Sequence, residues 1–460
     1  MAATVTHRTT PTQTGTIAST IAPLVTALVG ESPPVRFEFW DGSALGPGPP
    51  DASDEAPAPS LEGSRSDSAC VAGERNYGTI RVLSPNAIRR LLWAPNELGL
   101  GRAYVAGDLD VEGDIVAMVE TLRDATPKDL KFGPTAAREA FAAARRIGAI
   151  GRPLPPPPEE ARLSGWRHSL RRDASAISHH YDVGNDFYRI VLGPSMTYSC
   201  ARFVTESTTL EEAQAAKHDL VARKVGLHER SGMRLLDVGC GWGSMSIHAA
   251  STYGAQVVGI TISKEQAERA RERVKEAGVD DLVVIRLQDY REMGSEQFDA
   301  ISSIGMAEHV GAPKIDQYFE CLRKALVPTG RLLNHAISSV GGSKLGRKSF
   351  VGRYVFPDGE LMDVGDTVLA MERNGFEVRD VESLREHYAQ TLKHWVANLE
   401  ARWDDAVAAA DEPHARIWRL YMAGSAVGFT DGGVNIHQVL GVVPTAAGEA
   451  SVPRTRTDWY

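Results

Sequence analysis

The chain has 460 residues, of which 43% are hydrophobic and 24% charged, enough for roughly two or three soluble domains with a large core. Its formal net charge of −9 argues against a general nucleic-acid binder, so no nucleic-acid partner is expected. The four cysteines lie far apart without a CxxC pair, so the sequence predicts neither a disulfide framework nor a metal site.

The N-terminal residues show no charged leader followed by an apolar core and a cleavage site. No window approaches the roughly 20 consecutive apolar residues that a membrane span needs. We therefore expect a cytoplasmic protein that is neither secreted by that route nor integral to a membrane.

The first third of the chain predicts a small domain that is interrupted by a loop. Residues 1–34 are rich in Thr, Ala and Pro and are expected to be mobile or weakly helical, and the pattern of residues 35–43 predicts a strand running into a turn. Residues 44–76 are rich in Pro, Gly, Ser and acids, which predicts a disordered acidic loop. A strand and then a helix are predicted over residues 80–93. These elements define an N-terminal α/β domain of about 35–125.

A basic segment follows, which we assign to residues 126–174. Residues 127–173 hold ten Lys or Arg against five Asp or Glu. One interpretation is a solvated helix followed by a stiff polyproline linker. The alternative is a basic face that meets an anionic membrane surface.

The remainder, residues 175–460, has the regular pattern of an α/β domain. A helix is predicted around 208–228, and a strand, a glycine turn and a second helix follow it. Further strands are predicted at VVGITIS, LVVIRLQ, FDAISSIGM and GRLLNHAIS, alternating with helices. This alternation indicates a Rossmann-like, mostly parallel sheet that binds ligands at the carboxyl ends of its strands.

The glycine turn LLDVGCGWGSM (235–245) could serve either a dinucleotide or S-adenosylmethionine (SAM). A dinucleotide site needs GxGxxG and an acid some 20 residues later for the ribose. The spacing here differs, and the next strand ends in Thr261 and Ile262 rather than in an acid. The pattern therefore favours a class I SAM-dependent methyltransferase over a nicotinamide oxidoreductase. The SAM prediction rests on Asp237 before the glycines and on an adenine-side loop of Gln288, Asp289 and Tyr290.

Several motifs together resemble one family of enzymes. They are SHHYDVGNDFYRIVLGPSMTYSCARF (178–203), LEEAQAAKHDLVARKVGL, LLDVGCGWGSMSIHAA, VVGITISKEQ, LQDYRE, SSIGMAEHVG and LLNHAIS. In their order and spacing the chain resembles the cyclopropane fatty acid synthases, including actinobacterial relatives that make tuberculostearic (10-methyl) acyl chains. The resemblance is strong over roughly 175–440 and looser over the N-terminal domain.

This resemblance implies a mechanism and a set of catalytic residues. In the family an acyl-chain alkene attacks the SAM methyl group, and a bound bicarbonate ion removes a proton from the resulting carbocation. The matching ligands of bicarbonate are Cys200, Glu308, His335, Ile337 and Tyr388, with backbone amides at Cys200 and Ile337. Taken singly, Cys200 could be a small buried hydrophobe, His335 a core histidine and Tyr388 an interface aromatic.

The resemblance also implies how SAM is held. It places Tyr198 and Ser199 near the methionine end, Gly239 and Gly241 beneath it, Ile262 and Gln266 toward the ribose and adenine, and Asp289 and Tyr290 beside the adenine. Asp289 stands where some relatives carry Gly-Trp, so the adenine contacts are the least defined part of the predicted site.

The acyl chain needs an apolar tunnel, and residues 340–430 are predicted to supply a lipid-binding cap insertion over the sheet. The aromatic residues there could line it or form ordinary core at helical spacing: Trp395, Trp403, Trp418, Tyr421 and Phe429. Four basic residues could touch a headgroup phosphate: Lys344, Arg347, Lys348 and Arg353.

The leading hypothesis is a SAM-dependent C-methyltransferase acting on an unsaturated acyl chain of a membrane phospholipid, peripherally at the inner face of the cell membrane. Its product would be a cyclopropane, or else a methylene branch that a separate reductase converts to a methyl branch. The double-bond position and headgroup preference stay open. A homodimer is expected by resemblance. The rival hypotheses are a nicotinamide oxidoreductase and a non-catalytic lipid-binding protein.

Overall fold

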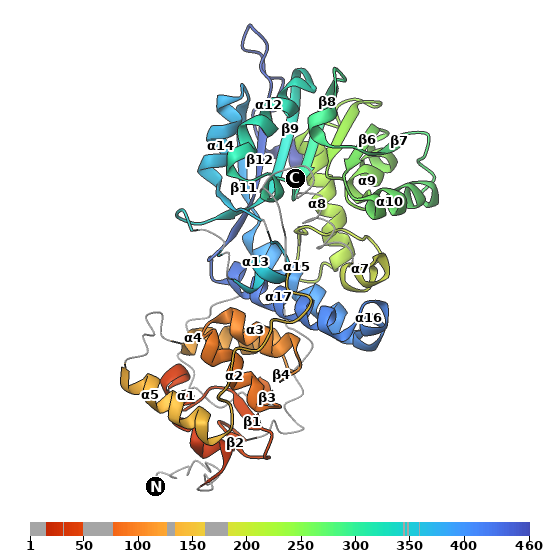
Figure 1. The fold of residues 1–460 in the computed structure, drawn as a ribbon. Helices are drawn as coiled ribbons and strands as arrows, with labels where there is room; N and C mark the ends of the chain where they lie inside the picture. The colour runs from red at the N-terminus through yellow and green to blue at the C-terminus, as the bar shows by residue number, and fades with distance from the viewer. Residues whose placement is uncertain are drawn as a thin grey trace, which may run out of the picture. The chain divides into compact units, whose positions relative to one another are not determined.

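The computed structural model describes residues 15–30, 32–48, 77–126, 134–161, 183–343, 346, 349–357 and 359–460. The chain divides into two compact units (Figure 1). Unit 1 comprises residues 1–160 and 412–427, and unit 2 comprises residues 161–411 and 428–460. Most of the predicted acidic loop, from residue 49 to 76, lies outside the described residues.

Unit 1 contains a four-stranded sheet with the order β2-β1-β3-β4. Its strands are β1 (Arg36–Phe39), β2 (Ala44–Leu45), β3 (Gly78–Val82) and β4 (Leu109–Gly113). Its helices are α1 (Ile17–Val29), α2 (Pro85–Trp93), α3 (Glu97–Val105), α4 (Ile115–Ala125) and α5 (Pro134–Arg146). The strand at 35–43 and the strand and helix at 80–93 therefore form as predicted, and the Ser84 side chain caps α2.

Helix α1 lies within residues 1–34, for which the sequence predicts a mobile or weakly helical segment. The Thr16 side chain accepts a hydrogen bond from Ser19 N and caps the helix. Ala18, Ile21 and Val25 are buried in the core of unit 1. Their spacing puts them on one face of the helix, so the segment is fixed by burial of a narrow apolar stripe that the Thr- and Ala-rich composition conceals.

Unit 2 contains the central sheet, with the strand order β11-β12-β9-β8-β5-β6-β7 and a short β10 beside β9. The strands are β5 (Arg234–Val238), β6 (Gln256–Thr261), β7 (Val283–Leu287), β8 (Phe298–Ile304), β9 (Leu326–Ser339), β10 (Met362–Asp363), β11 (Glu377–Ser383) and β12 (Asn435–Val442). From β7 to β9 all neighbours are parallel, whereas β12 and β11 continue the sheet antiparallel. The chain leaves β5 toward β6 and later returns to its other side at β8, which makes this a switch point where ligands bind.

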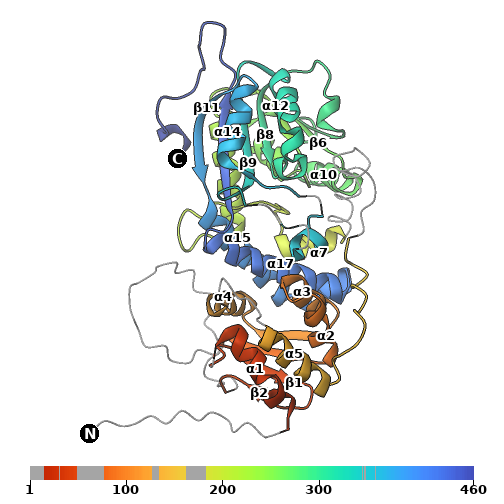
Figure 2. The same cartoon turned by 60° about the vertical axis from the view of Figure 1, so that its left-hand side comes forward.

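Helices cover both faces of this sheet (Figures 1 and 2). On one face lie α8 (Leu210–Lys224), α9 (Ser244–Tyr253) and α10 (Lys264–Glu276), and on the other α11 (Ala307–Val310), α12 (Ile315–Lys324) and α14 (Val364–Arg373). The other helices are α7 (Asn185–Leu192), α13 (Phe350–Tyr354), α15 (Arg385–Ala401), α16 (Trp403–Ala409) and α17 (Glu412–Thr430), most of which belongs to unit 1. Short 3-10 turns stand at Tyr290–Glu292, Ala312–Lys314 and Thr457–Trp459.

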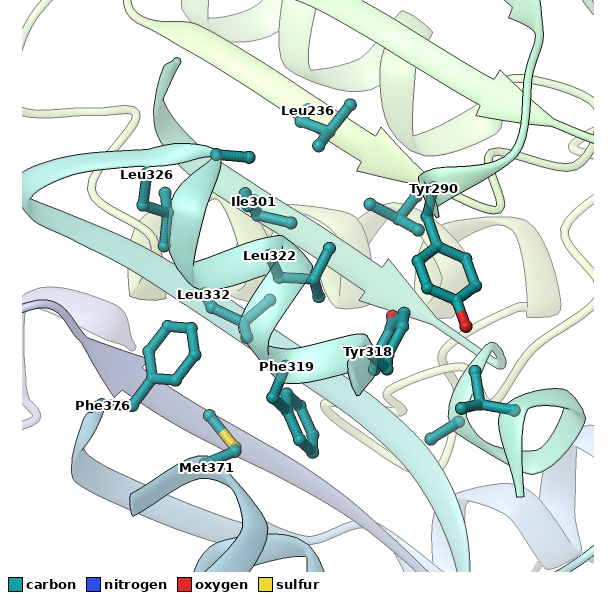
Figure 3. Close-up of a cluster of buried hydrophobic side chains, with 14 of the residues drawn as sticks. Leu236, Tyr290, Ile301, Tyr318, Phe319, Leu322, Leu326, Leu332, Met371 and Phe376 are labelled. Atoms are coloured by element: carbon teal, nitrogen blue, oxygen red, sulfur yellow. The ribbon is translucent and has the colours of Figure 1, made fainter. Parts of the chain in front are cut away.

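Adjacent residues of β5 pack on opposite faces of the sheet, in two separate hydrophobic cores. Leu236 packs with α12 and α14 residues in one cluster, where Phe319, Met371 and Phe376 come together (Figure 3). Its neighbour Leu235 packs with residues of α8, α9 and α10 in the other. This two-sided burial accounts for the nearly continuous apolar runs of the predicted strands.

The lipid-binding cap insertion expected around residues 340–430 stays a prediction, and the structure distributes this stretch over several parts of the fold. Strand β11 belongs to the central sheet, and residues 412–427 belong to unit 1. Of the five aromatic residues predicted there, all but Trp403 are buried, which agrees with their interpretation as core. Lys344, Arg347 and Lys348 lie outside the described residues, and Arg353 is partly buried in α13. Within the described part of the chain, no helix combines the length and apolarity needed to span a membrane.

Candidate functional site

The glycine turn after β5 fixes the floor of the site. The Gly239 and Cys240 amides both donate to Ile260 O, at 2.9 and 3.0 Å, which folds the turn back onto β6. Gly239 has a φ of +73°, and a Cβ atom there would lie 2.4 Å from Met306 Sδ. The positive φ favours glycine at this position, and the Met306 side chain packs directly against its backbone.

A pocket opens at the carboxyl ends of β5, β6, β7 and β8. The structure brings all ten residues predicted to hold SAM to its walls: Tyr198, Ser199, Asp237, Gly239, Gly241, Ile262, Gln266, Gln288, Asp289 and Tyr290. They come from four separate segments of the chain, as expected for a switch-point site. Their individual contacts with SAM stay a prediction.

Asp237 is the buried carboxylate of this pocket. Its Oδ2 accepts from Ser246 Oγ at 2.7 Å and its Oδ1 from Ser302 Oγ at 2.9 Å. Burial raises its pKa, and the two serine hydroxyls oppose that shift. The side chain is thus held rigidly at the end of β5, where it can accept from a cationic group.

The predicted adenine side is held by contacts within the chain. Asp289 accepts from Arg291 Nε at 2.8 Å and from its NH2 at 2.7 Å, which outweighs the effect of burial and lowers the pKa of Asp289. Thr261 Oγ1 donates to Gln266 Oε1 at 2.8 Å. The Tyr290 ring meets Tyr318 edge-on with centroids 4.9 Å apart (Figure 3). The Asp289 carboxylate is therefore already paired, whereas Tyr290 offers a ring to the pocket.

The five predicted bicarbonate ligands do not line this pocket, but they are linked to one another beside it. Glu308 Oε1 accepts from Ile337 N at 2.7 Å, so that amide is engaged by Glu308. His335 precedes Ile337 by two residues on β9, and Gly305 N donates to its carbonyl at 2.9 Å. The segment around Glu308 contributes Met306 to the pocket wall.

Cys200 and Tyr388 meet through a shared carbonyl. Leu384 O accepts from Cys200 Sγ at 3.6 Å and from Tyr388 N at 3.0 Å. Leu384 N donates in turn to the carbonyl of Ile436, which is the partner of Ile337 in the β9–β12 register. A continuous chain of contacts therefore joins Cys200 and Tyr388 to Glu308.

Two buried polar atoms in this group lack a partner among the described residues, Glu308 Oε2 and His335 Nε2. Burial raises the pKa of Glu308 to about 7 and lowers the pKa of His335 well below its usual value. Gln438 Nε2 lies 3.2 Å from His335 Nδ1, and donation to that atom leaves the proton on Nε2. A donor at His335 and an acceptor at Glu308 fit a small anion that carries one hydroxyl group, as bicarbonate does.

Sequence reasoning missed Lys217 and His218, which also line the pocket. Both lie on the buried face of α8, and Lys217 is fully buried. A signal was present, because Gln214, Lys217 and Lys224 occupy the helical spacing at which apolar residues are expected. A polar side chain on the buried stripe of a helix needs a partner inside the protein.

Comparisons with known proteins place this architecture in a family. The family model described as mycolic acid cyclopropane synthetase matches residues 168–439, more than half of the chain. The chain belongs to this family. A probable fatty acid methyltransferase of Pseudomonas putida is 38% identical over 96% of the chain and 100% of its own length. The cyclopropane-fatty-acyl-phospholipid synthase of Escherichia coli K12 is 34% identical over 78% of the chain and 87% of its own.

Solved structures agree with the cyclopropane synthetase assignment. The cyclopropane synthase MmaA2 of Mycobacterium tuberculosis superposes with a TM-score of 0.56 at 34% identity, over 60% of this chain and 98% of that one. The mycolic acid cyclopropane synthase CmaA1 complexed with SAH and CTAB gives 0.55 at 34% identity, over 58% and 98%. The fold prediction is confirmed, and the chain is a SAM-dependent methyltransferase of the cyclopropane-fatty-acyl-phospholipid synthase type.

Proposed function

We propose that the protein transfers a one-carbon unit from SAM to the double bond of an unsaturated acyl chain carried by a membrane phospholipid. The names of its relatives support this substrate class, since they include fatty acid methyltransferases and a cyclopropane-fatty-acyl-phospholipid synthase. The observation that carries the proposal is the pairing of a SAM-type pocket with a linked group of buried polar residues, Cys200 to Glu308, beside it.

Each part of the site has a distinct task in this proposal. SAM, when bound, would supply an electrophilic methyl group. The glycine turn and Asp237 would hold its amino-acid end, and Tyr290 would pack against its adenine. Glu308 Oε2 and His335 Nε2 would hold bicarbonate, which when bound would supply a base beside the substrate cation. The burial of these atoms keeps water away from that cation.

Two products are compatible with this site. Loss of a proton from the added carbon closes a cyclopropane ring, which is the product we propose. A hydride shift before proton loss would instead leave a 10-methylene branch, the precursor of a tuberculostearic chain once a separate reductase has acted. The same five residues would serve either outcome.

An assay with SAM and dioleoyl-phospholipid vesicles tests the proposal. We expect mass spectrometry to detect acyl chains heavier by one methylene unit, and NMR to distinguish ring CH2 protons from an exocyclic =CH2 group. A reductant should change the mass of a methylene product and leave a cyclopropane intact. If no heavier acyl chain forms although the protein binds S-adenosylhomocysteine (SAH), the proposed substrate is wrong.

We also propose that the protein works as a homodimer at the inner face of the cell membrane. Helix α5 supports the membrane contact, because Phe141 is 57% exposed and lies between exposed Arg138 and Arg145. The spacing of these three residues puts them on one helix face, so an apolar ring and two cations point the same way. Light scattering on the purified protein would test the dimer.

A further inference from the structure

Lys217 is a fully buried cation with an incomplete set of partners. Its Nζ donates to Ser199 Oγ at 2.8 Å. Among the described residues no second acceptor is present, and no carboxylate lies within ion-pair distance of its Nζ. An ammonium group carries three N–H donors, so two of them have no acceptor among the described residues. Because Lys217 lines the pocket, an acceptor arriving there can reach them.

A second buried lysine of the same helix shows how carboxylates of the chain can neutralise a buried ammonium group. Lys224 is also fully buried, but its Nζ lies 2.9 Å from Asp380 Oδ2 and 2.5 Å from Glu382 Oε2. Two carboxylates therefore neutralise Lys224, as a buried charge requires. Lys224 does not line the pocket. The contrast indicates that no anion from the described part of the chain neutralises Lys217.

The surroundings of Lys217 define the chemistry of the missing anion. Ser199 accepts from the ammonium, so the Ser199 hydroxyl hydrogen is free to point at a second acceptor. Asp237 lies close enough to interact with Lys217 electrostatically, but its oxygens bind Ser246 and Ser302. Two donors converging from Lys217 and Ser199 suit the paired oxygens of a carboxylate group.

We propose that Lys217 and Ser199 form a binding site for a carboxylate-type anion at the wall of the pocket. The assignment rests on the proposed function, since SAM and bicarbonate are the two sources of this chemistry in the proposed reaction. The α-carboxylate of SAM is favoured, because Lys217 and Ser199 both line the pocket whereas the predicted bicarbonate ligands do not. Lys217 also interacts electrostatically with Cys200 and His335, which keeps bicarbonate as the other source.

Desolvation supports the same conclusion. Burial lowers the pKa of Lys217 to about 7, and Cys200 and Asp237 offset only part of that shift. An anion bound at Nζ would favour the charged form and return the pKa toward its ordinary value.

Calorimetric binding to the full chain tests the assignment without any turnover. Lys217→Met keeps the length of the side chain and removes its charge, and Lys217→Gln keeps an N–H donor for Ser199. We expect both variants to bind SAH about 10- to 100-fold more weakly than the wild type, the effect of losing a charged hydrogen bond. Decarboxylated SAH (S-adenosyl-3-thiopropylamine), which keeps the amino group, should bind wild type and variants alike.

A second arm distinguishes the source of the anion. If bicarbonate is the ligand, the variants keep the wild-type affinity for SAH but lose the thermal stabilisation that bicarbonate gives to the wild type. Lys224→Met is the matched control, which should lower the melting temperature and leave both ligand responses unchanged.

The assignment is overturned if folded Lys217→Met and Lys217→Gln bind SAH and respond to bicarbonate as the wild type does. Failure of the wild type itself to bind SAH would instead reject the proposed function, so the two failures are distinguishable.

Discussion

At the residue scale, a substitution of Glu308 should affect methyl transfer without affecting cofactor binding. Its Oε1 is held by Ile337 N, whereas its buried Oε2 is unpartnered in the described part of the chain. Glu308→Gln should keep the first contact and lose the acceptor for bicarbonate. We expect SAH affinity within about twofold of the wild type and methyl transfer lowered by about 10²- to 10⁴-fold, the usual contribution of general acid–base catalysis.

Glu320→Gln is the matched control for this prediction, since Glu320 is exposed on α12 and pairs with Lys324. Its methyl transfer should equal that of the wild type. Full activity of Glu308→Gln in the vesicle assay would show that the predicted bicarbonate ligands are misplaced.

The pKa of Lys217 predicts how cofactor affinity depends on pH. The free protein releases the Lys217 proton near pH 7, whereas bound carboxylate holds it, so SAH binding takes up a proton above pH 7. SAH affinity should therefore fall between pH 7 and 9, by at most about tenfold per pH unit. Lys217→Met should lose this slope, and a slope that persists in the variant would assign it to another group. The titratable groups that interact with Lys217 are Cys200, His218, Asp237, His248 and His335.

Titration of Lys217 changes folding stability with pH in the direction opposite to its effect on SAH affinity. The pKa of the lysine is lower in the folded state than its ordinary value of 10.5, so the unfolded chain binds more protons between pH 7 and 10.5. This residue alone makes the free energy of unfolding rise with pH in that range. A fall in cofactor affinity at high pH therefore cannot be attributed to unfolding caused by Lys217.

The sequence identified side chains at the site better than it identified their contacts. Each of the ten residues predicted from short motifs lies at the pocket, because Gly239 and its neighbours occupy fixed offsets from the strand ends. The Ile337 amide bond to Glu308 depends on two segments 29 residues apart in the chain, which no local pattern reports. Lys217 was not predicted to line the pocket because the sequence of α8 has the pattern of an ordinary amphipathic helix. Only the structure shows that several of its polar positions are buried.

At the scale of elements, α5 predicts how the protein meets a membrane. Arg138→Glu combined with Arg145→Glu reverses two charges beside exposed Phe141 without touching buried residues. Each cation near an anionic surface contributes about 1 kcal/mol, so we expect vesicle affinity to fall by more than about tenfold. Sedimentation with phosphatidylglycerol vesicles at low and high salt measures it. Arg402→Glu changes an exposed charge between α15 and α16 and should bind as the wild type does. Equal binding of all variants would show that α5 does not contact the membrane.

Local periodicity predicted the parallel strands but not the antiparallel edge. Strands β5 to β9 were found because each is a short apolar run followed by a helix, and their order follows from right-handed crossovers. Strands β11 and β12 alternate less clearly and are separated by three helices. Their pairing depends on contacts such as Val381 with Val439, which are distant in sequence.

At the scale of the whole molecule, residues 412–427 are a late segment of the chain that is part of its N-terminal unit. They begin α17 and belong to unit 1, although residues before and after them belong to unit 2. Arg416 NH1 donates to Leu109 O at 3.3 Å and approaches Asp110 Oδ1 at 3.2 Å. Arg419 donates to Tyr104 Oη at 3.2 Å, Val111 O at 2.9 Å and Gly113 O at 3.2 Å. Unit 1 is therefore completed by a helix that follows most of the methyltransferase sequence.

This connection predicts that a substitution in α17 destabilises unit 1 while the cofactor site is unaffected. Arg419 is 8% exposed, and Arg419→Met removes charged hydrogen bonds to two carbonyls of β4 and to Tyr104. The free energy of unfolding of unit 1 should fall by about 1.5–3 kcal/mol per charged bond that is not replaced by water. Denaturant unfolding of the full chain, followed by hydrogen exchange in β4, would measure this loss, and SAH affinity should not change.

Arg402→Met is the control, because an exposed ion pair with Asp405 contributes less than about 1 kcal/mol. Equal protection of β4 in wild type and Arg419→Met would mean that α17 does not stabilise unit 1, since the loss of three buried hydrogen bonds cannot leave the strand's opening free energy unchanged.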